Sequence, residues 1–180
     1  MTNARKAATR VLLVAVLLAG HRGALRGQET VAADPADVES VDAIIAAVYD
    51  VISGPAGAER DWDRMRSLFL PDARLIPSAP GPNGGYQHRY MALDEWIEGA
   101  TQFFAANPFF EVEIARVDER YGHIAHAFST YESRREADGE PFTRGINSFQ
   151  LLNDGERWWI VNIFWQGETE EEPIPPHYLP

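Results

Sequence analysis

The stretch that decides the fold is residues 142–166, which read FTRGINSFQLLNDGERWWIVNIFWQ. Two runs rich in β-branched and aromatic residues flank Asn153-Asp154-Gly155-Glu156. Asp-Gly supplies the positive φ that a short hairpin connection needs. The stretch therefore predicts two antiparallel strands joined by a tight turn.

Both faces of the second of these strands are apolar. Because side chains alternate across a strand, its residues divide into two sets: Trp158, Ile160, Asn162 and Phe164 on one face, and Trp159, Val161, Ile163 and Trp165 on the other. Large apolar patches are rarely left in water, so we expect both faces to be covered.

Composition excludes several classes of function. The 180-residue chain suits one domain plus processing segments. Its 16 basic residues against 27 acidic ones give a formal net charge of -11, which repels phosphate backbones and anionic membranes. We therefore expect no nucleic acid partner. The absence of cysteine excludes disulfides, thiolate nucleophiles and cysteine-ligated metal sites.

The first 33 residues have the layout of a secretory signal peptide. A basic start at residues 5–10 precedes the apolar run 11–20, and Val31-Ala32-Ala33 supplies small residues for cleavage. The run is too short to cross a bilayer core of about 30 Å as a helix. We expect an exported protein, periplasmic or secreted, that is free of the membrane after cleavage of residues 1–33. The alternative is an uncleaved membrane anchor.

Three helices are predicted in the first part of the mature chain. Apolar residues recur at helical spacing in segments 34–52, 61–70 and 93–106, and the first begins with an Asp34-Pro35 cap. One short strand, 73–77, follows the second helix. Residues 78–90 are rich in proline and glycine, which predicts a long loop that could act as a lid or binding loop.

From Phe109 onward the apolar period changes from 3.6 to 2, which predicts four successive antiparallel strands. The order of elements is typical of an α+β fold, in which a curved antiparallel sheet packs on three N-terminal helices. Residues 169–180 form an acidic and then proline-rich tail, which we expect to be extended and largely solvated.

Four features together point to a known family. They are the amphipathic first helix, the segment Phe69-Leu70-Pro71-Asp72-Ala73-Arg74, the helix around Trp96, and the closing strand after Gly155-Glu156-Arg157-Trp158. In this order they resemble the nuclear transport factor 2-like superfamily, which includes ketosteroid isomerase, scytalone dehydratase and the SnoaL-like polyketide cyclases. The resemblance covers about residues 36–168, within a domain that we place at residues 34–168. It implies a cone-shaped roll with a pocket between sheet and helices, and a homodimer through the outer sheet face.

The pocket of such a cone would be lined by the concave sheet face and the third helix. The residues that we place there are Trp96, Phe103, Asn147, Phe149, Trp158 and Asn162. A lone amide on an apolar face must be hydrogen-bonded, so Asn147 and Asn162 either satisfy backbone or buried water, or orient a ligand. Arg144 is either an ion-pair partner on the outer face or an anion-binding group at the rim. His88, near the tip of the loop, is a further candidate for ligand binding.

Three residues are candidates for acid–base catalysis: His126, Tyr131 and Asp72. His126 and Tyr131 lie on opposite faces of strand 124–134, and the pattern leaves open which face is concave. Asp72 is either a base or a residue that caps its turn or pairs with Arg74. His123 and His126 point to opposite faces and cannot share a metal ion, so we expect no metal site and no cofactor.

Three functions remain open at this point. The first is an exported domain that binds a small apolar or amphipathic molecule. The second is a cofactor-independent lyase or isomerase acting on a small apolar or cyclic substrate, which a titratable pair facing one cavity would favour. The third is a structural dimer whose pocket is filled by its own aromatic side chains, which a cavity below about 300 Å³ would favour.

Overall fold

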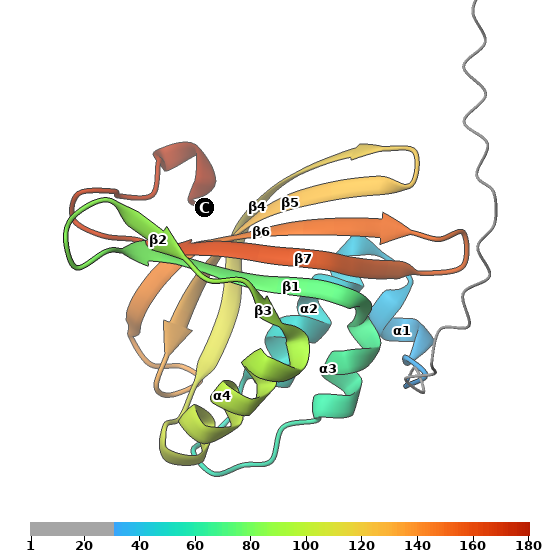
Figure 1. Cartoon of the computed structure of the whole chain (residues 1–180), viewed down its shortest axis with the longest axis horizontal. Coiled ribbons are helices and arrows are strands. Elements are labelled where there is room, and N and C mark those ends of the chain that lie inside the picture. Colours follow the sequence, from blue (N-terminus) through green and yellow to red (C-terminus); the bar gives the residue numbers. More distant parts are fainter. Residues whose placement is uncertain (1–30) are drawn as a thin grey trace, which may run out of the picture.

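The computed structural model describes residues 31–180, so nearly all of the leader predicted at residues 1–33 lies outside the described residues. One curved sheet is covered on one face by helices (Figure 1). The elements in chain order are α1 (Pro35–Val38), α2 (Val41–Ile52), α3 (Trp62–Leu68), β1 (Phe69–Pro80), β2 (Tyr86–His88), β3 (Met91–Ala92), α4 (Leu93–Ala106), β4 (Phe110–Tyr121), β5 (Ile124–Arg134), β6 (Pro141–Asn153), β7 (Trp158–Gly167) and the 3-10 helix η1 (Pro176–Tyr178). The predicted α+β fold class is confirmed.

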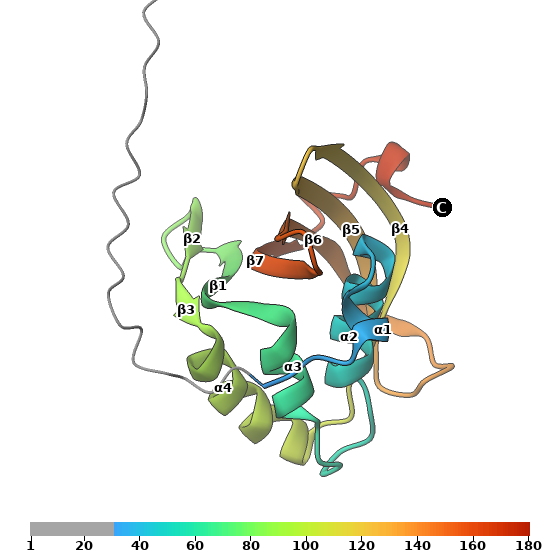
Figure 2. The ribbon, with the colours of Figure 1, turned by 90° about the vertical axis from the view of Figure 1, so that its right-hand side faces the viewer.

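The sheet is mixed rather than purely antiparallel. Its strand order is β2-β1-β7-β6-β5-β4, with β3 paired to β1. The strands β4 to β7 pair antiparallel in succession, as predicted. In contrast, β1 lies parallel to β7, with Leu75 opposite Ile163. The sheet bends so that the helices lie on its concave side, which is the predicted cone-shaped roll (Figure 2).

The first predicted helix is divided in two by a second cap. The Asp34 carboxylate accepts the N–H of Ala36 at 2.9 Å and begins α1, and the Ser40 hydroxyl accepts the N–H of Ala43 at 3.0 Å and begins α2. The apolar side chains of α2 are buried in the core beneath the sheet. Within residues 31–180, every helix falls short of the length and apolar character that a membrane span requires.

The chain between the second and third predicted helices is more regular than its sequence indicates. β1 runs from Phe69 to Pro80 instead of the predicted 73–77. β2 pairs with the end of β1 inside the segment 78–90 that we predicted as a loop. Pairing with distant β7 and with β2 supplies the backbone hydrogen bonds, and local residue preferences carry no information about such partners.

The predicted hairpin is present as β6 and β7. The Asp154 carboxylate accepts the backbone N–H groups of Glu156 and Arg157, both at 2.9 Å, and the indole N–H of Trp159 at 2.7 Å. Gly155 has a φ of 106°, which favours glycine. These bonds explain why a sequence of four residues suffices to place the turn.

A bulge in β7 changes the faces predicted for its second half. Val161 interrupts the regular pairing of β7 with β6. Beyond it, Ile163 and Trp165 line the cavity, so the alternate residues Asn162 and Phe164 face outward. The prediction that Asn162 and Phe164 share the face of Trp158 is therefore wrong, because one extra residue turns every later side chain to the other face.

A buried guanidinium holds the loop between α2 and α3. Arg60 is 6% exposed and donates to the backbone carbonyls of Ile52 at 3.1 Å, Gly54 at 2.8 Å and Ala58 at 2.9 Å. The same group lies 5.1 Å from the centre of the Phe104 ring on α4. Arg60 thus links the helical layer to the end of α4, where the site described below begins.

The tail packs on the outer face of the sheet instead of extending into solvent (Figure 1). Ile174 is 8% exposed, and the backbone carbonyl of Tyr178 accepts the Thr130 hydroxyl at 2.7 Å. The Tyr178 ring lies 5.5 Å from that of Phe128. The expectation of a largely solvated tail is wrong for this part of it, because apolar groups of the outer face give the tail a surface on which to bury Ile174.

Candidate functional site

A cavity of about 640 Å³ lies between α4 and the concave face of the sheet. Ligand sites commonly have volumes of roughly 300–1,000 Å³. Its aromatic lining consists of Trp96, Phe103, Phe104, Phe109, Tyr131 and Trp165. The protein's own aromatic side chains therefore wall the cavity without filling it, which argues against a vestigial pocket.

The helix α4 supplies one wall. Trp96 and Phe103 are two turns apart and so lie on the same face of the helix, toward the cavity. The ring of Trp62 meets Trp96 edge-on at 6.2 Å. Phe109 stacks on Phe104 at 5.2 Å. These aromatic pairs pack the side chains of the wall against one another.

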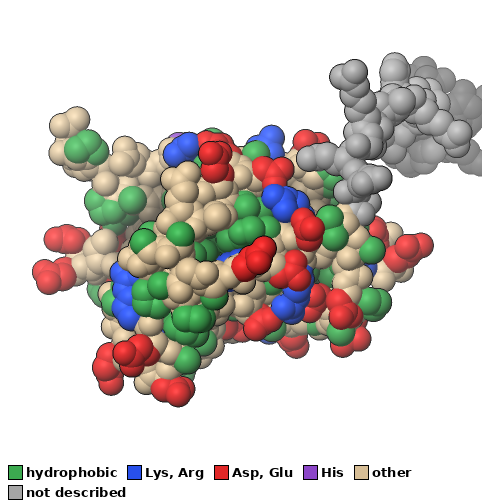
Figure 3. All heavy atoms as spheres, turned by 90° about the horizontal axis from the view of Figure 1, so that it is seen from below, with side chains coloured by type: hydrophobic (Ala, Val, Ile, Leu, Met, Phe, Trp, Pro, Cys, Tyr) green, Lys and Arg blue, Asp and Glu red, His purple; other side chains and the backbone are tan. Residues whose placement is uncertain are grey.

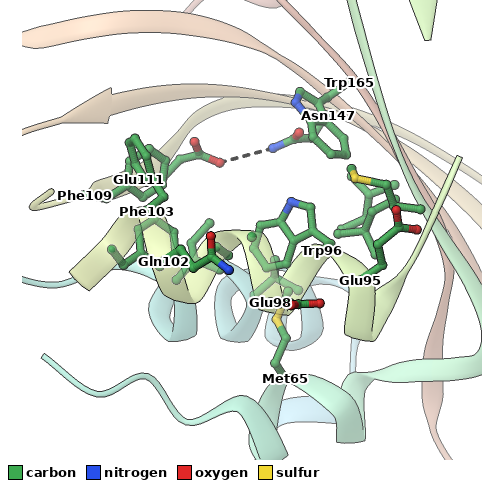
Figure 4. A pocket seen from close by; sticks show the side chains of 18 of the residues that line it. Met65, Glu95, Trp96, Glu98, Gln102, Phe103, Phe109, Glu111, Asn147 and Trp165 are labelled. Carbon is green, nitrogen blue, oxygen red and sulfur yellow. Dashed lines mark hydrogen bonds between the residues drawn. The ribbon is translucent and has the colours of Figure 1, made fainter. Parts of the chain in front are cut away.

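Glu111 of β4 places a partly buried carboxylate on the opposite wall. It accepts the Ser133 hydroxyl at 2.7 Å and the Asn147 amide at 3.4 Å. Figure 4 shows the carboxylate pointing toward that amide, with the Trp96 indole facing both. Burial raises the pKa of Glu111 to about 7, against the opposing effect of the two hydrogen bonds. In the described part of the chain, no arginine or histidine forms an ion pair with Glu111.

Two tyrosines flank this carboxylate. Tyr131 lines the cavity and is 6% exposed. Burial, and then the charge of Glu111, raises the pKa of Tyr131, so its hydroxyl keeps its proton. The Tyr49 hydroxyl accepts the Asn147 amide at 3.0 Å and lies 2.7 Å from the Ser129 hydroxyl. The network ties α2, β4, β5 and β6 together around Glu111.

The mouth of the cavity carries charged and polar groups. Arg89 and Glu95 form an ion pair there, and Glu98 and Gln102 of α4 complete the rim. Viewed from the helical side, hydrophobic side chains show between acidic and basic ones (Figure 3). A ligand would pass this polar rim before it reaches the aromatic interior.

Comparison with solved structures places this geometry in a known fold. No protein-family model matches the chain, and no curated protein matches it by sequence. The structure is similar to a nuclear transport factor 2-like protein of unknown function from Silicibacter pomeroyi, with a TM-score of 0.50 and 15% identity over 72% of this chain and 94% of that chain. It is also similar to a nuclear transport factor 2-like protein of unknown function from Pseudomonas putida, with a TM-score of 0.50 and 11% identity over 71% of this chain and 82% of that one.

An uncharacterised protein with a cystatin-like fold from Caulobacter vibrioides is similar as well, with a TM-score of 0.52 and 14% identity over 74% of this chain and 90% of that one. The chain has the nuclear transport factor 2-like fold. The resemblance found in the sequence is thereby confirmed at the level of the fold.

Four of the predicted site residues line the cavity of this nuclear transport factor 2-like cone. They are Trp96 and Phe103 from α4, Tyr131 from β5 and Asn147 from β6. The concave face of β5 is therefore the face of Tyr131, which the sequence had left open. Asn147 is hydrogen-bonded to Tyr49 and Glu111, so it has structural partners as well as a place at the cavity.

Two predicted pocket residues belong to the core instead. Phe149 is fully buried, with its ring 6.3 Å from that of Tyr49. Trp158 is 8% exposed, and the guanidinium carbon of Arg120 lies over its indole, 5.4 Å from the centre of the Trp158 ring. Both belong to the buried core, and neither is among the residues that line the cavity.

Three predicted ligand-binding residues lie away from the cavity. Asn162 faces outward because of the bulge in β7. Arg144 donates to the Glu168 carboxylate at 2.9 Å, which supports the ion-pair alternative over the rim alternative. His88 is exposed in β2, with its ring 5.1 Å from that of Tyr90.

Two of the predicted catalytic residues also lie elsewhere. His126 is on the outer sheet face, where its ring nitrogen is 3.4 Å from the Glu119 carboxylate. Asp72 is exposed in β1, and its backbone carbonyl, not its carboxylate, accepts from Arg74 at 2.8 Å. Neither lines the cavity, so neither can reach a ligand bound there.

Glu111 is the ionisable residue inside the cavity that the sequence analysis missed, and Phe104, Phe109 and Trp165 of the lining were not predicted either. The alternation of Phe110 and Val112 with Glu111 and Glu113 places the apolar residues inside by the usual rule. The structure places Glu111 on the inner face, where it lines the cavity, and leaves Val112 38% exposed. Among residues 31–180, no cluster of three or more histidine, aspartate or glutamate side chains could hold a metal ion.

Proposed function

We propose that this protein binds a small, mainly apolar organic molecule that carries a polar group. The observation that supports this function most directly is the cavity of about 640 Å³, in which six aromatic side chains surround a Glu111–Asn147 pair. Such an arrangement buries an apolar body and orients it through a few hydrogen bonds, as small-molecule sites generally do.

Binding of the neutral dye Nile red would test this proposal. We expect one dye per chain and a blue-shifted emission, because the dye enters an apolar site. Ala100→Trp fills the cavity from α4 and should weaken binding by about 10-fold or more. The matched control is Ala105→Trp, on the exposed side of the same helix. Equal affinity in A100W and A105W would show that the dye binds elsewhere and contradict the proposal.

A second candidate function is cofactor-independent proton transfer, as in a lyase or isomerase. Glu111 and Tyr131 are the titratable pair that would favour it, and both line one cavity. A pKa of about 7 suits a general base at neutral pH, because the group is ionised often enough and still binds a proton well. In this scheme the Glu111 carboxylate takes a proton from a carbon next to a carbonyl, the Tyr131 hydroxyl hydrogen-bonds the resulting enolate oxygen, and Glu111 returns the proton.

Exchange of the α-hydrogens of 2-tetralone in D₂O, followed by NMR, would test proton transfer. We expect acceleration over buffer by the wild type and a loss of about 100-fold or more in Glu111→Gln. The control is Glu156→Gln, an exposed carboxylate in the β6–β7 turn. Equal exchange rates in E111Q and wild type would exclude Glu111 as the base and leave the binding function in place.

Export and self-association stay predictions. The leader at residues 1–33 lies almost wholly outside the described residues. The outer sheet face proposed for a homodimer is partly covered by the tail, and it still exposes Val117, Ile124 and Phe164. A dimer would cover these apolar side chains.

A further inference from the structure

Glu111 is a partly buried carboxylate at the cavity that forms no ion pair among the described residues. One of its oxygens accepts a hydrogen bond of 2.7 Å from Ser133, and the other has a long contact of 3.4 Å with Asn147. An ionised carboxylate can accept about four hydrogen bonds, and buried charges are usually paired with an opposite charge. In the described part of the chain that opposite charge is missing, and Glu111 borders the cavity.

The charges around the cavity favour a cation over an anion. The charged residues of its lining are Arg89, Glu95, Glu98 and Glu111. Arg89 already forms an ion pair with Glu95. The remaining carboxylates, Glu98 at the mouth and Glu111 inside, give the cavity a negative potential when both are ionised. An anionic ligand would be repelled from the rim and would meet Glu111 at close range.

The aromatic walls suit a cation for a separate reason. The negative face of an aromatic ring attracts a cation that lies within about 6 Å, and indole is the strongest such group among side chains. Trp96 from α4 and Trp165 from β7 both line the cavity, and Figure 4 shows Trp165 beside Asn147 and the Trp96 indole below the Glu111–Asn147 hydrogen bond. Aromatic rings and one carboxylate therefore surround the same volume.

We propose that the ligand of this cavity is an organic cation, a protonated primary, secondary or tertiary amine carried on an apolar body. This inference rests on the proposed binding function and names the class of its ligand. The ammonium N–H donates to the weakly engaged oxygen of Glu111, and the indole faces of Trp96 and Trp165 stabilise the positive charge. The apolar body fills the part of the cavity lined by Met65, Leu75 and Phe109.

Three probes with one ring system would test the ligand class by calorimetry at about pH 8, where Glu111 is mostly ionised. They are 1-naphthylmethylamine, 1-naphthylmethanol and 1-naphthylacetate, which are cationic, neutral and anionic. We expect the amine to bind about 10-fold or more tightly than the alcohol, and the carboxylate to bind most weakly. In Glu111→Gln the ratio of amine to alcohol affinity should fall to about 2-fold or less. Glu156→Gln is the control and should keep the wild-type ratio.

The outcomes separate this inference from the proposed function. If the alcohol binds as tightly as the amine, or the carboxylate binds most tightly, the ligand class is wrong and the binding function stands. If none of the three probes binds, and Nile red does not bind either, both fail. If E111Q keeps the preference for the amine, the assignment of Glu111 as the anionic partner is overturned.

The pH dependence of the wild type gives a second readout that needs no variant. The titratable and charged groups that face Glu111 are Asp42, Tyr49 and Asp50 from α2, Tyr131 from β5, and Glu113 and Arg116 on its own strand, with Arg89, Glu95 and Glu98 at the mouth. Burial raises the pKa of both tyrosines, so they stay neutral up to pH 8. Amine affinity should rise by about 10-fold between pH 5.5 and 8 as Glu111 loses its proton, while alcohol affinity changes little. Amine affinity that is constant over this range would overturn the inference.

Discussion

Burial of Glu111 couples the stability of the fold to pH. The pKa of this carboxyl is about 7 in the folded protein and 4.5 in its ordinary state. The folded chain therefore holds the proton more tightly, so the contribution of Glu111 to stability is fully present below pH 4.5 and is lost as the pH rises to about 7. We expect the free energy of unfolding to fall by on the order of 3 kcal/mol across this window from Glu111 alone.

The variant Glu111→Gln isolates this effect. Glutamine stays neutral at every pH and can still bond to Ser133, so E111Q should be more stable than wild type above about pH 7 and similar to it near pH 4.5. Urea unfolding at intervals across this range would measure the difference. The pKa values of Asp37 and Asp154 are lowered, so the contributions of these two groups to stability change with pH only below this window. A constant difference between E111Q and wild type, like that of the exposed control Glu156→Gln, would show that Glu111 is not titrating in the window.

Some residues of the cavity could be predicted from the sequence, and others could not. Trp96 and Phe103 could be predicted, because helical spacing places them on one face of a long helix. Glu111 could not, since the alternation rule assigns the charged residues of a strand to solvent. What reverses the rule is a set of polar partners, Ser133 and Asn147, that come from two other strands. Their meeting with Glu111 depends on strand register, which the sequence of β4 alone does not contain.

The strands show the same division between local and distant causes. The β6–β7 turn is determined by Asp154 and Gly155, whose bonds are local, and it was predicted correctly. The bulge at Val161 and the length of β1 depend on pairing with other strands, and both were missed. Because the prediction missed this one extra residue in β7, it placed Asn162 at the cavity, where the structure has Trp165.

The tail should contribute to stability as an element of the fold. Ile174 is 8% exposed against the outer sheet face, so Ile174→Ala removes buried methyl groups and should lower the free energy of unfolding by about 2 kcal/mol. The control is Glu171→Ala, at an exposed position of the same tail, which should change it by less than about 0.5 kcal/mol. Equal unfolding midpoints for I174A and E171A would mean that the tail is not held on the sheet in solution.

At the scale of the whole molecule, the two apolar faces of the curved sheet differ in how completely they are covered. The concave face is covered by helices except at the cavity, where α4 stands away from the sheet. The outer face is covered only in part, by the tail around Ile174 and Tyr178. Because β7 carries apolar residues on both faces, the sequence predicted that both faces of the strand are covered. It did not reveal that the chain's own C-terminal segment supplies some of the cover.

The uncovered part of the outer face is the place where the predicted homodimer can be tested. Phe164 is 46% exposed there, and Val117 is 44% exposed. We expect wild type to elute with twice the mass of one chain in size-exclusion chromatography with light scattering. Phe164→Glu should give monomers, because an unpaired charge buried in an apolar interface costs several kcal/mol. Ala105→Glu changes an exposed residue of α4, on the helical side of the sheet, and should leave the dimer intact. A monomeric wild type, or an F164E variant that stays dimeric, would contradict association through this face.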